Sequence, residues 1–170
     1  MRHLVTALES ALSQRNYYAA LALALTLPDI VGWVRNPKST SRQRCVEWFD
    51  LYIKQRYFRT AMHSVPAHQF LTGNDFYALR CSYLHEGRDE ILSQRARNVL
   101  DDFEFVVCND GMRVHCNQRN STLQLQVDVF CRDIADGIES CLADLEGDPA
   151  AQQRLATLLT MRDLSGKVLI

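Results

Sequence analysis

The sequence lacks several features that would assign a function directly. No apolar stretch reaches the roughly 20 residues that cross a bilayer, and the longest, 17–27, is followed by Pro28 and Asp29. The N-terminus has no basic start followed by an apolar stretch and a small-residue cleavage site, so it does not resemble a secretory signal. The seven glycines never cluster into a phosphate-binding loop, and no G-x-S-x-G turn is present. We therefore expect a cytoplasmic protein with no membrane partner, and neither of these two enzyme classes.

An excess of basic charge is also missing. The net charge is -1 and the sequence pI is about 6.5, whereas a dedicated nucleic-acid binder is usually basic. A local patch can still contact a nucleic acid in such a protein. The 170 residues, with 47% hydrophobic and 23% charged side chains, are typical of one soluble domain, which we expect to span 1–170.

The cysteines show no pattern typical of a disulfide framework or of zinc. None of the six forms a C-x-x-C pair, and without an export signal we expect six reduced thiols. Cys108, His115 and Cys116 could approach one another, but their spacing lacks closely paired ligands. We therefore expect no metal and no cofactor, with His115 facing water, and a Cys/His metal sensor is a distant alternative function.

Helical periodicity dominates the first hundred residues and returns at the end. Apolar residues at helical spacing predict helices over 3–14, 17–27, 41–57 and 74–86, then from Asp128 to about Leu145, and after Asp148-Pro149. Pro28 is predicted to end the second helix, with a short continuation through Trp33. Thr72 is a predicted N-cap, with Asp75 in a weak capping box, and Gly87 is the predicted left-handed stop.

Strand-like alternation appears after residue 100. Apolar and polar residues alternate over 103–107, 112–116 and 123–127, and Asn109-Asp110-Gly111 is a hairpin signal. The fold class predicted is therefore mainly α. It is a helical bundle with a small three-stranded antiparallel sheet inserted after residue 100, at about 102–127.

One helix carries an arginine and a histidine five residues apart, Arg80 and His85. A structural explanation is available: Arg80 would flank the apolar stripe, solvated or paired with Asp75 or Glu86. His85 would then lie in the last turn, where the helix dipole favours a cation. A catalytic explanation is that the histidine moves a proton and the arginine clamps a phosphate.

Residues 71–87 resemble the signature helix of the HEPN (higher eukaryotes and prokaryotes nucleotide-binding) superfamily. Its hallmark is Arg, four to six residues, then His, within an all-helical domain, and Arg80 and His85 match with four residues between them. The chain also resembles a group of uncharacterised bacterial proteins, in which a Trp-Phe-Asp helix precedes Tyr-x-Leu-Arg-Cys and Leu-His-x-Gly. Cys81 departs from many catalytic members, which have Asn, Asp or His after the arginine.

The resemblance implies a homodimer in which two such helices face each other across one cleft. It also implies metal-independent RNA cleavage by a toxin or defence protein, with Arg80 and His85 catalytic. The RNA nucleophile is its own 2′-hydroxyl, and the products carry a 2′,3′-cyclic phosphate and a 5′-hydroxyl.

Other side chains are candidates for contacting the RNA. Ser82 and Glu86 share the helix with the two catalytic candidates, and Arg113 and Arg119 belong to the predicted sheet and its following loop. We expect RNA and a second copy as partners, with an antitoxin or another protein as a further partner. The competing hypothesis is a non-catalytic helical module whose same helix only binds a partner.

Overall fold

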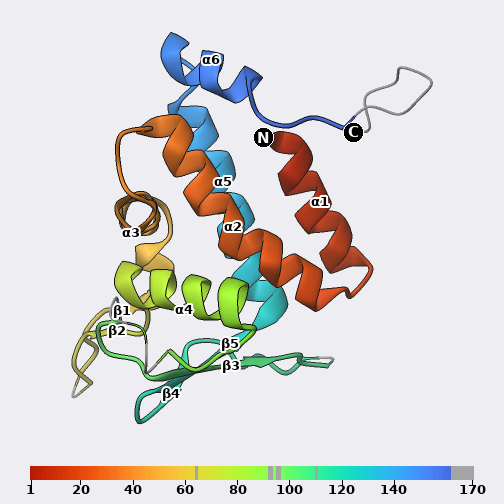
Figure 1. Ribbon diagram of the computed structural model, residues 1–170. Coiled ribbons are helices and arrows are strands. Elements are labelled where there is room, and N and C mark those ends of the chain that lie inside the picture. Colours follow the sequence, from red (N-terminus) through yellow and green to blue (C-terminus); the bar gives the residue numbers. More distant parts are fainter. Residues whose placement is uncertain (64, 92–93, 95–96, 110, 162–170) are drawn as a thin grey trace.

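The computed structural model describes residues 1–63, 65–91, 94, 97–109 and 111–161, which are mainly helical (Figure 1). In chain order the helices are α1 (Arg2–Ser13), α2 (Tyr17–Arg35), α3 (Ser41–Tyr52), the 3-10 turn η1 (Lys54–Tyr57), α4 (Gly73–Glu86), α5 (Val127–Asp144) and α6 (Pro149–Ala156). The strands are β1 (Phe58–Arg59), β2 (His68–Gln69), β3 (Asp102–Val106), β4 (Asn117–Arg119) and β5 (Thr122–Gln126).

The central helix of the bundle is α2, which contacts all five other α-helices. Figure 1 shows α1 and α3 on opposite sides of α2, α4 across its lower end, and the three-stranded sheet beyond α4. Large aromatic side chains fill the core where α3, α4 and α5 meet, and the Phe49 and Phe76 rings lie 5.5 Å apart. This packing fixes α4 between the bundle and the sheet.

The prediction that Pro28 ends the second helix was wrong, because α2 continues through it to Arg35. A proline inside a helix lacks one backbone donor and costs roughly 3 kcal/mol. Pro28 is buried together with its neighbours Leu27 and Val31, so burial of apolar surface offsets that cost. By length and composition α2 could cross a membrane, although half of its apolar window is buried against the rest of the protein, and core helices pass the same test.

The predicted sheet forms, but its topology is mixed rather than antiparallel. Its strand order is β3-β5-β4, with β3 parallel to β5 and β4 antiparallel to β5. The alternation over 103–107 and 123–127 located β3 and β5, whereas 112–116 is not a strand and β4 follows it. Alternation indicates which face of a strand is buried and says nothing about its direction, so the sequence could not distinguish the two topologies.

Two predicted helix boundaries also need correction. The helix predicted over 41–57 ends at Tyr52 and is followed by the separate turn η1. Asp128 is not the cap of α5: the helix begins at Val127 after Gln126, and Asp128 lies in its first turn. A carboxylate in the first turn still interacts favourably with the helix dipole, which explains why the pattern resembled a cap.

Candidate functional site

The helix that carries the Arg-x4-His pair is α4, and both of its ends are defined as predicted. The Thr72 hydroxyl accepts a hydrogen bond from the Asp75 backbone N–H at 3.2 Å. Gly87 ends the helix in the left-handed conformation, with φ 68°. Local sequence therefore fixes the length of α4 and places Arg80 and His85 within it.

The Arg80 side chain is engaged with Asp29 of α2, and neither of the carboxylates considered from the sequence is its partner. Arg80 Nη2 donates to Asp29 Oδ2 at 3.0 Å. Arg44 Nε of α3 donates to the other oxygen, Oδ1, at 2.7 Å, and Arg44 Nη2 forms an ion pair with the same oxygen at 2.7 Å. Ser41 Oγ also donates to Oδ2, at 2.8 Å. Three helices thus meet at one carboxylate, and we call Asp29, Ser41, Arg44 and Arg80 the Asp29 cluster.

The Asp29 cluster is largely shielded from solvent and keeps a positive charge. The side chains of Arg80, Asp29 and Arg44 are 14%, 15% and 16% exposed. Two guanidinium groups share one carboxylate, which leaves one net positive charge in a setting of reduced dielectric. Among the described residues, Arg80 Nε is buried and has no hydrogen-bond partner. The uncompensated positive charge attracts anions to this part of the surface, whereas the buried Nε is not accessible to them.

Two thiols adjoin the Asp29 cluster. Burial, followed by the negative charge of Asp29, raises the pKa of the Cys45 thiol to about 12. Cys45 is therefore protonated at neutral pH and is a poor nucleophile. Cys81 is partly exposed. The pKa of Tyr77 is raised, mainly because Tyr77 is partly buried and secondly because the Cys81 thiol lies next to it.

His85 and its neighbours lie on different sides of α4. His85 is exposed in the last turn. Ser82 is buried, and its Oγ donates to the Glu90 carbonyl at 2.6 Å, so it fastens the chain that follows α4. Glu86 is exposed and accepts from Gln94 Nε2 at 2.9 Å. Of the four residues proposed for this helix, only Arg80 belongs to the Asp29 cluster.

Arg113 and Arg119 are both exposed, the first in the segment before β4 and the second within β4. This strand is an edge of the sheet, on the far side of β5 from β3. No hydrogen bond or ion pair among the described residues connects these arginines to Arg80 or His85. A bound RNA would have to extend from α4 to the sheet to contact all four.

His115 does not face water, contrary to the expectation from the sequence. Its side chain is 6% exposed, and neither ring nitrogen has a hydrogen-bond partner in the described part of the chain. Its Nε2 lies 3.7 Å from Asp133 Oδ2, and its ring lies 5.6 Å from that of Tyr57. Burial lowers the pKa of His115, and the nearby Asp133 opposes that shift. The expectation that His115 faces water came from reading 112–116 as a strand with alternating faces, but this segment is not a strand.

Within the described residues, no group of three or more His, Cys, Asp or Glu side chains is placed to hold a metal ion. Cys116 follows His115 with a positive φ of 54°, and burial raises the pKa of its thiol to about 12. The Cys116 thiol is therefore protonated at neutral pH.

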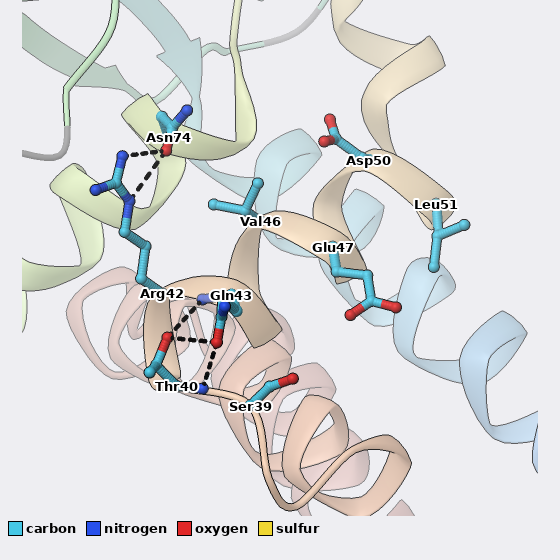
Figure 2. Close-up of a pocket in the computed structure, with 9 residues that line it drawn as sticks. All are labelled: Ser39, Thr40, Arg42, Gln43, Val46, Glu47, Asp50, Leu51 and Asn74. Carbon is cyan, nitrogen blue, oxygen red and sulfur yellow. Dashed lines mark hydrogen bonds between the residues drawn. The ribbon is translucent and has the colours of Figure 1, made fainter.

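An open groove of about 820 Å³ runs along the outer face of α3 and the start of α4 (Figure 2). In Figure 2, Arg42 reaches across to Asn74, and Asn74 Oδ1 accepts from Arg42 Nε and Nη2 at 3.2 and 2.8 Å. Glu47, Asp50 and Leu51 line the opposite end. Neither the apolar spacing nor the HEPN-like motif pointed to this surface.

Compared with family models, with curated proteins and with solved structures, the chain matches none. The HEPN resemblance therefore stays a prediction that depends on the residues quoted for it.

Proposed function

We propose that this protein is a HEPN-like, metal-independent endoribonuclease of the toxin or defence type. The observation that supports this proposal best is the Asp29 cluster, in which Arg80 and Arg44 share one carboxylate. The positive charge that remains on the two arginines suits an RNA phosphate. Asp29 holds the Arg80 guanidinium in place before substrate arrives, which reduces the entropy lost on binding.

The chemistry requires two proton transfers. The RNA 2′-oxygen forms a bond to phosphorus and loses its proton, while the bond from phosphorus to the 5′-oxygen breaks and that oxygen gains a proton. An exposed histidine can accept the first proton or donate the second. Arg80 would hold the phosphate and stabilise the charge that grows on it.

The active form in this proposal is a homodimer. Five residues along a helix correspond to a rotation of about 140° and a rise of about 7.5 Å, so one α4 directs Arg80 and His85 to different sides. Two copies related by a two-fold axis could supply the base and the acid from their two His85 side chains. RNA is the proposed substrate, and an antitoxin or another protein is the proposed regulator of a toxin of this type.

A non-catalytic interaction module is the competing function. It is favoured by the same Arg80 contacts, because an arginine that is 14% exposed and paired with Asp29 already has a structural role. The buried Ser82, bonded to the Glu90 carbonyl, is likewise explained without a substrate. In this alternative α4 stabilises the bundle, and function lies on another surface.

Cleavage of labelled RNA by purified protein distinguishes the two functions. His85→Ala should lower the rate by about 10²–10⁴-fold, as expected for loss of a general acid or base. Arg80→Lys keeps the charge beside Asp29 but loses the two-pronged phosphate contact, so it should also reduce the rate. Chelator should leave the wild-type rate unchanged.

His63→Asn is a matched control, because His63 is also exposed and asparagine tolerates its positive φ of 50°. The control should cleave at the wild-type rate. Full activity in His85→Ala, or loss of activity with chelator, would exclude the mechanism. An inactive wild type across single-stranded and structured RNAs would favour the interaction module.

A further inference from the structure

Residues 111–116 lead into β4 and belong to neither a helix nor a strand. The first three of them are exposed, and the Val114 N–H donates to Gln126 Oε1 at 3.4 Å, which is a long hydrogen bond. His115 differs from them, because its side chain is 6% exposed. We call residues 111–116 the His115 segment. Burial of this imidazole ring is a main contact between the segment and the helices.

The imidazole ring lies beside η1 and α5 without a hydrogen-bond partner. Both ring nitrogens are buried and unpartnered among the described residues. The ring lies 5.6 Å from that of the fully buried Tyr57, and Nε2 lies 3.7 Å from Asp133 Oδ2. Asp133 already has partners, because Oδ2 accepts from the Tyr57 hydroxyl at 3.1 Å and Oδ1 pairs with Arg56 Nη1 at 2.6 Å. A positive charge on the His115 ring would therefore be only partly compensated.

Charged and titratable groups surround His115 from η1, from α5 and from its own segment. They are Arg56, Tyr57, Asp128, Asp133, Arg113 and Cys116. Burial has the largest effect on the pKa of His115 and lowers it, and Arg113 acts in the same direction. The two aspartates and the Gln126 backbone oppose this shift without cancelling it. Burial raises the pKa of the thiol and of the phenol, so both are neutral and supply no counter-charge.

We propose that His115 is a pH-sensitive switch, which holds the His115 segment against η1 and α5 while its ring is neutral and releases the segment when its ring is protonated. A charged imidazole is hydrated in water and loses that hydration in the buried site, where Asp133 is already paired. Release requires only that a weakly bonded segment move, so the core of the bundle stays packed. This inference does not depend on RNA cleavage.

The direction of the switch is set by where the proton binds better. The buried ring binds a proton less readily than a solvated ring, whose pKa is about 6.5, so opening becomes more favourable as the pH falls through that value. Between about pH 7.5 and pH 5.5, uptake of one proton can raise the opening equilibrium by at most about tenfold. A several-fold rise is the expected result.

The neighbouring Cys116 thiol measures this opening in the full-length chain. Its pKa is about 12 while the segment is closed, so it reacts with a disulfide reagent almost only from the open state. The protein is labelled with a dipyridyl disulfide at about pH 7.5 and about pH 5.5, and mass spectrometry identifies the modified cysteines. Each rate is divided by that of the same cysteine in urea at the same pH, which removes the pH dependence of the thiol itself.

The normalised rate of Cys116 should rise several-fold on acidification. The buried Cys45, Cys131 and Cys141 should stay unreactive in the same samples, which separates local opening from unfolding of the whole protein. His115→Phe and His115→Gln do not titrate in this range, so in both variants the normalised rate of Cys116 should be equal at the two pH values. Thermal melting of each variant confirms that it remains folded.

His63→Asn is the matched control, because it removes an exposed histidine and should keep the wild-type response. Three results would each overturn the switch. These are a wild-type rate that does not rise on acidification, an equal rise in either His115 variant, and core thiols that react in step with Cys116. None of them bears on the proposed ribonuclease, because cleavage is measured separately.

Discussion

At the scale of single residues, Asp75 connects α4 to the chain that leads into the sheet. It is fully buried, and its Oδ1 accepts from the backbone N–H groups of 98, 99 and 100 at 2.6, 3.1 and 3.4 Å. Its Oδ2 accepts from the Thr72 hydroxyl at 2.6 Å. The sequence predicted Asp75 as part of a weak capping box, and the structure assigns its carboxylate a second, longer-range role.

We predict that Asp75→Ala destabilises the protein strongly. Removal of the carboxylate leaves three backbone donors without their acceptor, at about 1–3 kcal/mol for each buried unsatisfied group. The free energy of unfolding from urea denaturation should fall by at least about 2 kcal/mol. Asp89→Ala, at an exposed position, should change it by less than about 0.5 kcal/mol. Equal effects of the two substitutions would show that the carboxylate does not anchor this segment.

His115 makes stability depend on pH. Its folded-state pKa is lowered by burial, and although Asp133 and Asp128 oppose the shift, Arg113 adds to it. The unfolded chain therefore binds a proton more readily than the folded protein, and stability falls as the pH drops below the unfolded value of about 6.5. Above that pH His115 is neutral in both states, and its full contribution to the free energy of unfolding is present.

Because the pKa of His115 is lowered in the folded protein, we predict that acid destabilises it. The free energy of unfolding should decline between about pH 7 and pH 5, and His115→Phe should decline less, because phenylalanine keeps the ring beside Tyr57 without titrating. Urea denaturation at several pH values measures both slopes. His63→Asn provides the comparison, since it removes an exposed histidine and leaves the buried His115 in place. Identical slopes for wild type and His115→Phe would contradict the prediction.

At the scale of elements, the continuation of α2 through Pro28 determines the candidate site. Had the helix ended there, Asp29 would not lie between α3 and α4. As part of α2, Asp29 meets Arg44 and Arg80, which come from two other helices. The burial of Pro28 and its apolar neighbours thus keeps Asp29 in the helix, where its carboxylate pairs with Arg80.

Gly137 of α5 permits α5 to approach Trp48 of α3 and Ile53, which follows α3, closely. A methyl group added there would lie 2.6 Å from Ile53 Cγ2 and 2.8 Å from Trp48 Cζ2. Replacing a helical glycine by alanine normally stabilises a helix by roughly 1 kcal/mol, but overpacking costs about 1–3 kcal/mol. Because both contacts are with core side chains, we predict that Gly137→Ala lowers the melting temperature.

The control is Gly147→Ala, since a methyl group at Gly147 meets nothing within 4 Å. This variant should melt within a degree or so of wild type. Calorimetry of the two variants separates packing from any general effect of removing a glycine. A more stable Gly137→Ala would mean that α5 moves away from Trp48 at little cost.

At the scale of the whole molecule, the thiols report on unfolding. All six cysteines are free, and Cys45, Cys131 and Cys141 are buried. Burial raises the pKa of Cys45 and Cys131 to about 12, so the reactive thiolate is scarce as well as inaccessible. We predict that these three thiols react with a thiol reagent only when the protein unfolds.

Titration with a chromogenic thiol reagent checks this prediction. Six thiols should react in denaturant without reductant, and at most the three partly exposed ones, Cys81, Cys108 and Cys116, should react rapidly in buffer. Urea below the unfolding transition should not expose the rest. Fewer than six reactive thiols in denaturant would reveal a disulfide, and rapid reaction of all six in buffer would show that the core opens readily.

The sequence by itself determined the features that depend on neighbouring residues. The boundaries of α4, its Thr72 cap and its Gly87 stop follow from local hydrogen bonds and backbone preferences. The same is true of α6, which begins with the predicted Asp148 cap, and of the alternation that located β3 and β5. These signals act within a few residues, so they can be recognised without the fold.

Only the tertiary structure decided the pairings between distant parts of the chain. Asp29 and Arg80 are 51 residues apart in the sequence. The partners predicted for Arg80 were Asp75 and Glu86, because these carboxylates lie close to it along the chain. The parallel pairing of β3 with β5 and the burial of His115 against Asp133 are of the same kind. Charged side chains and strands pair with groups that lie close to them in space. Which groups are close depends on how the helices pack and cannot be read from the local sequence.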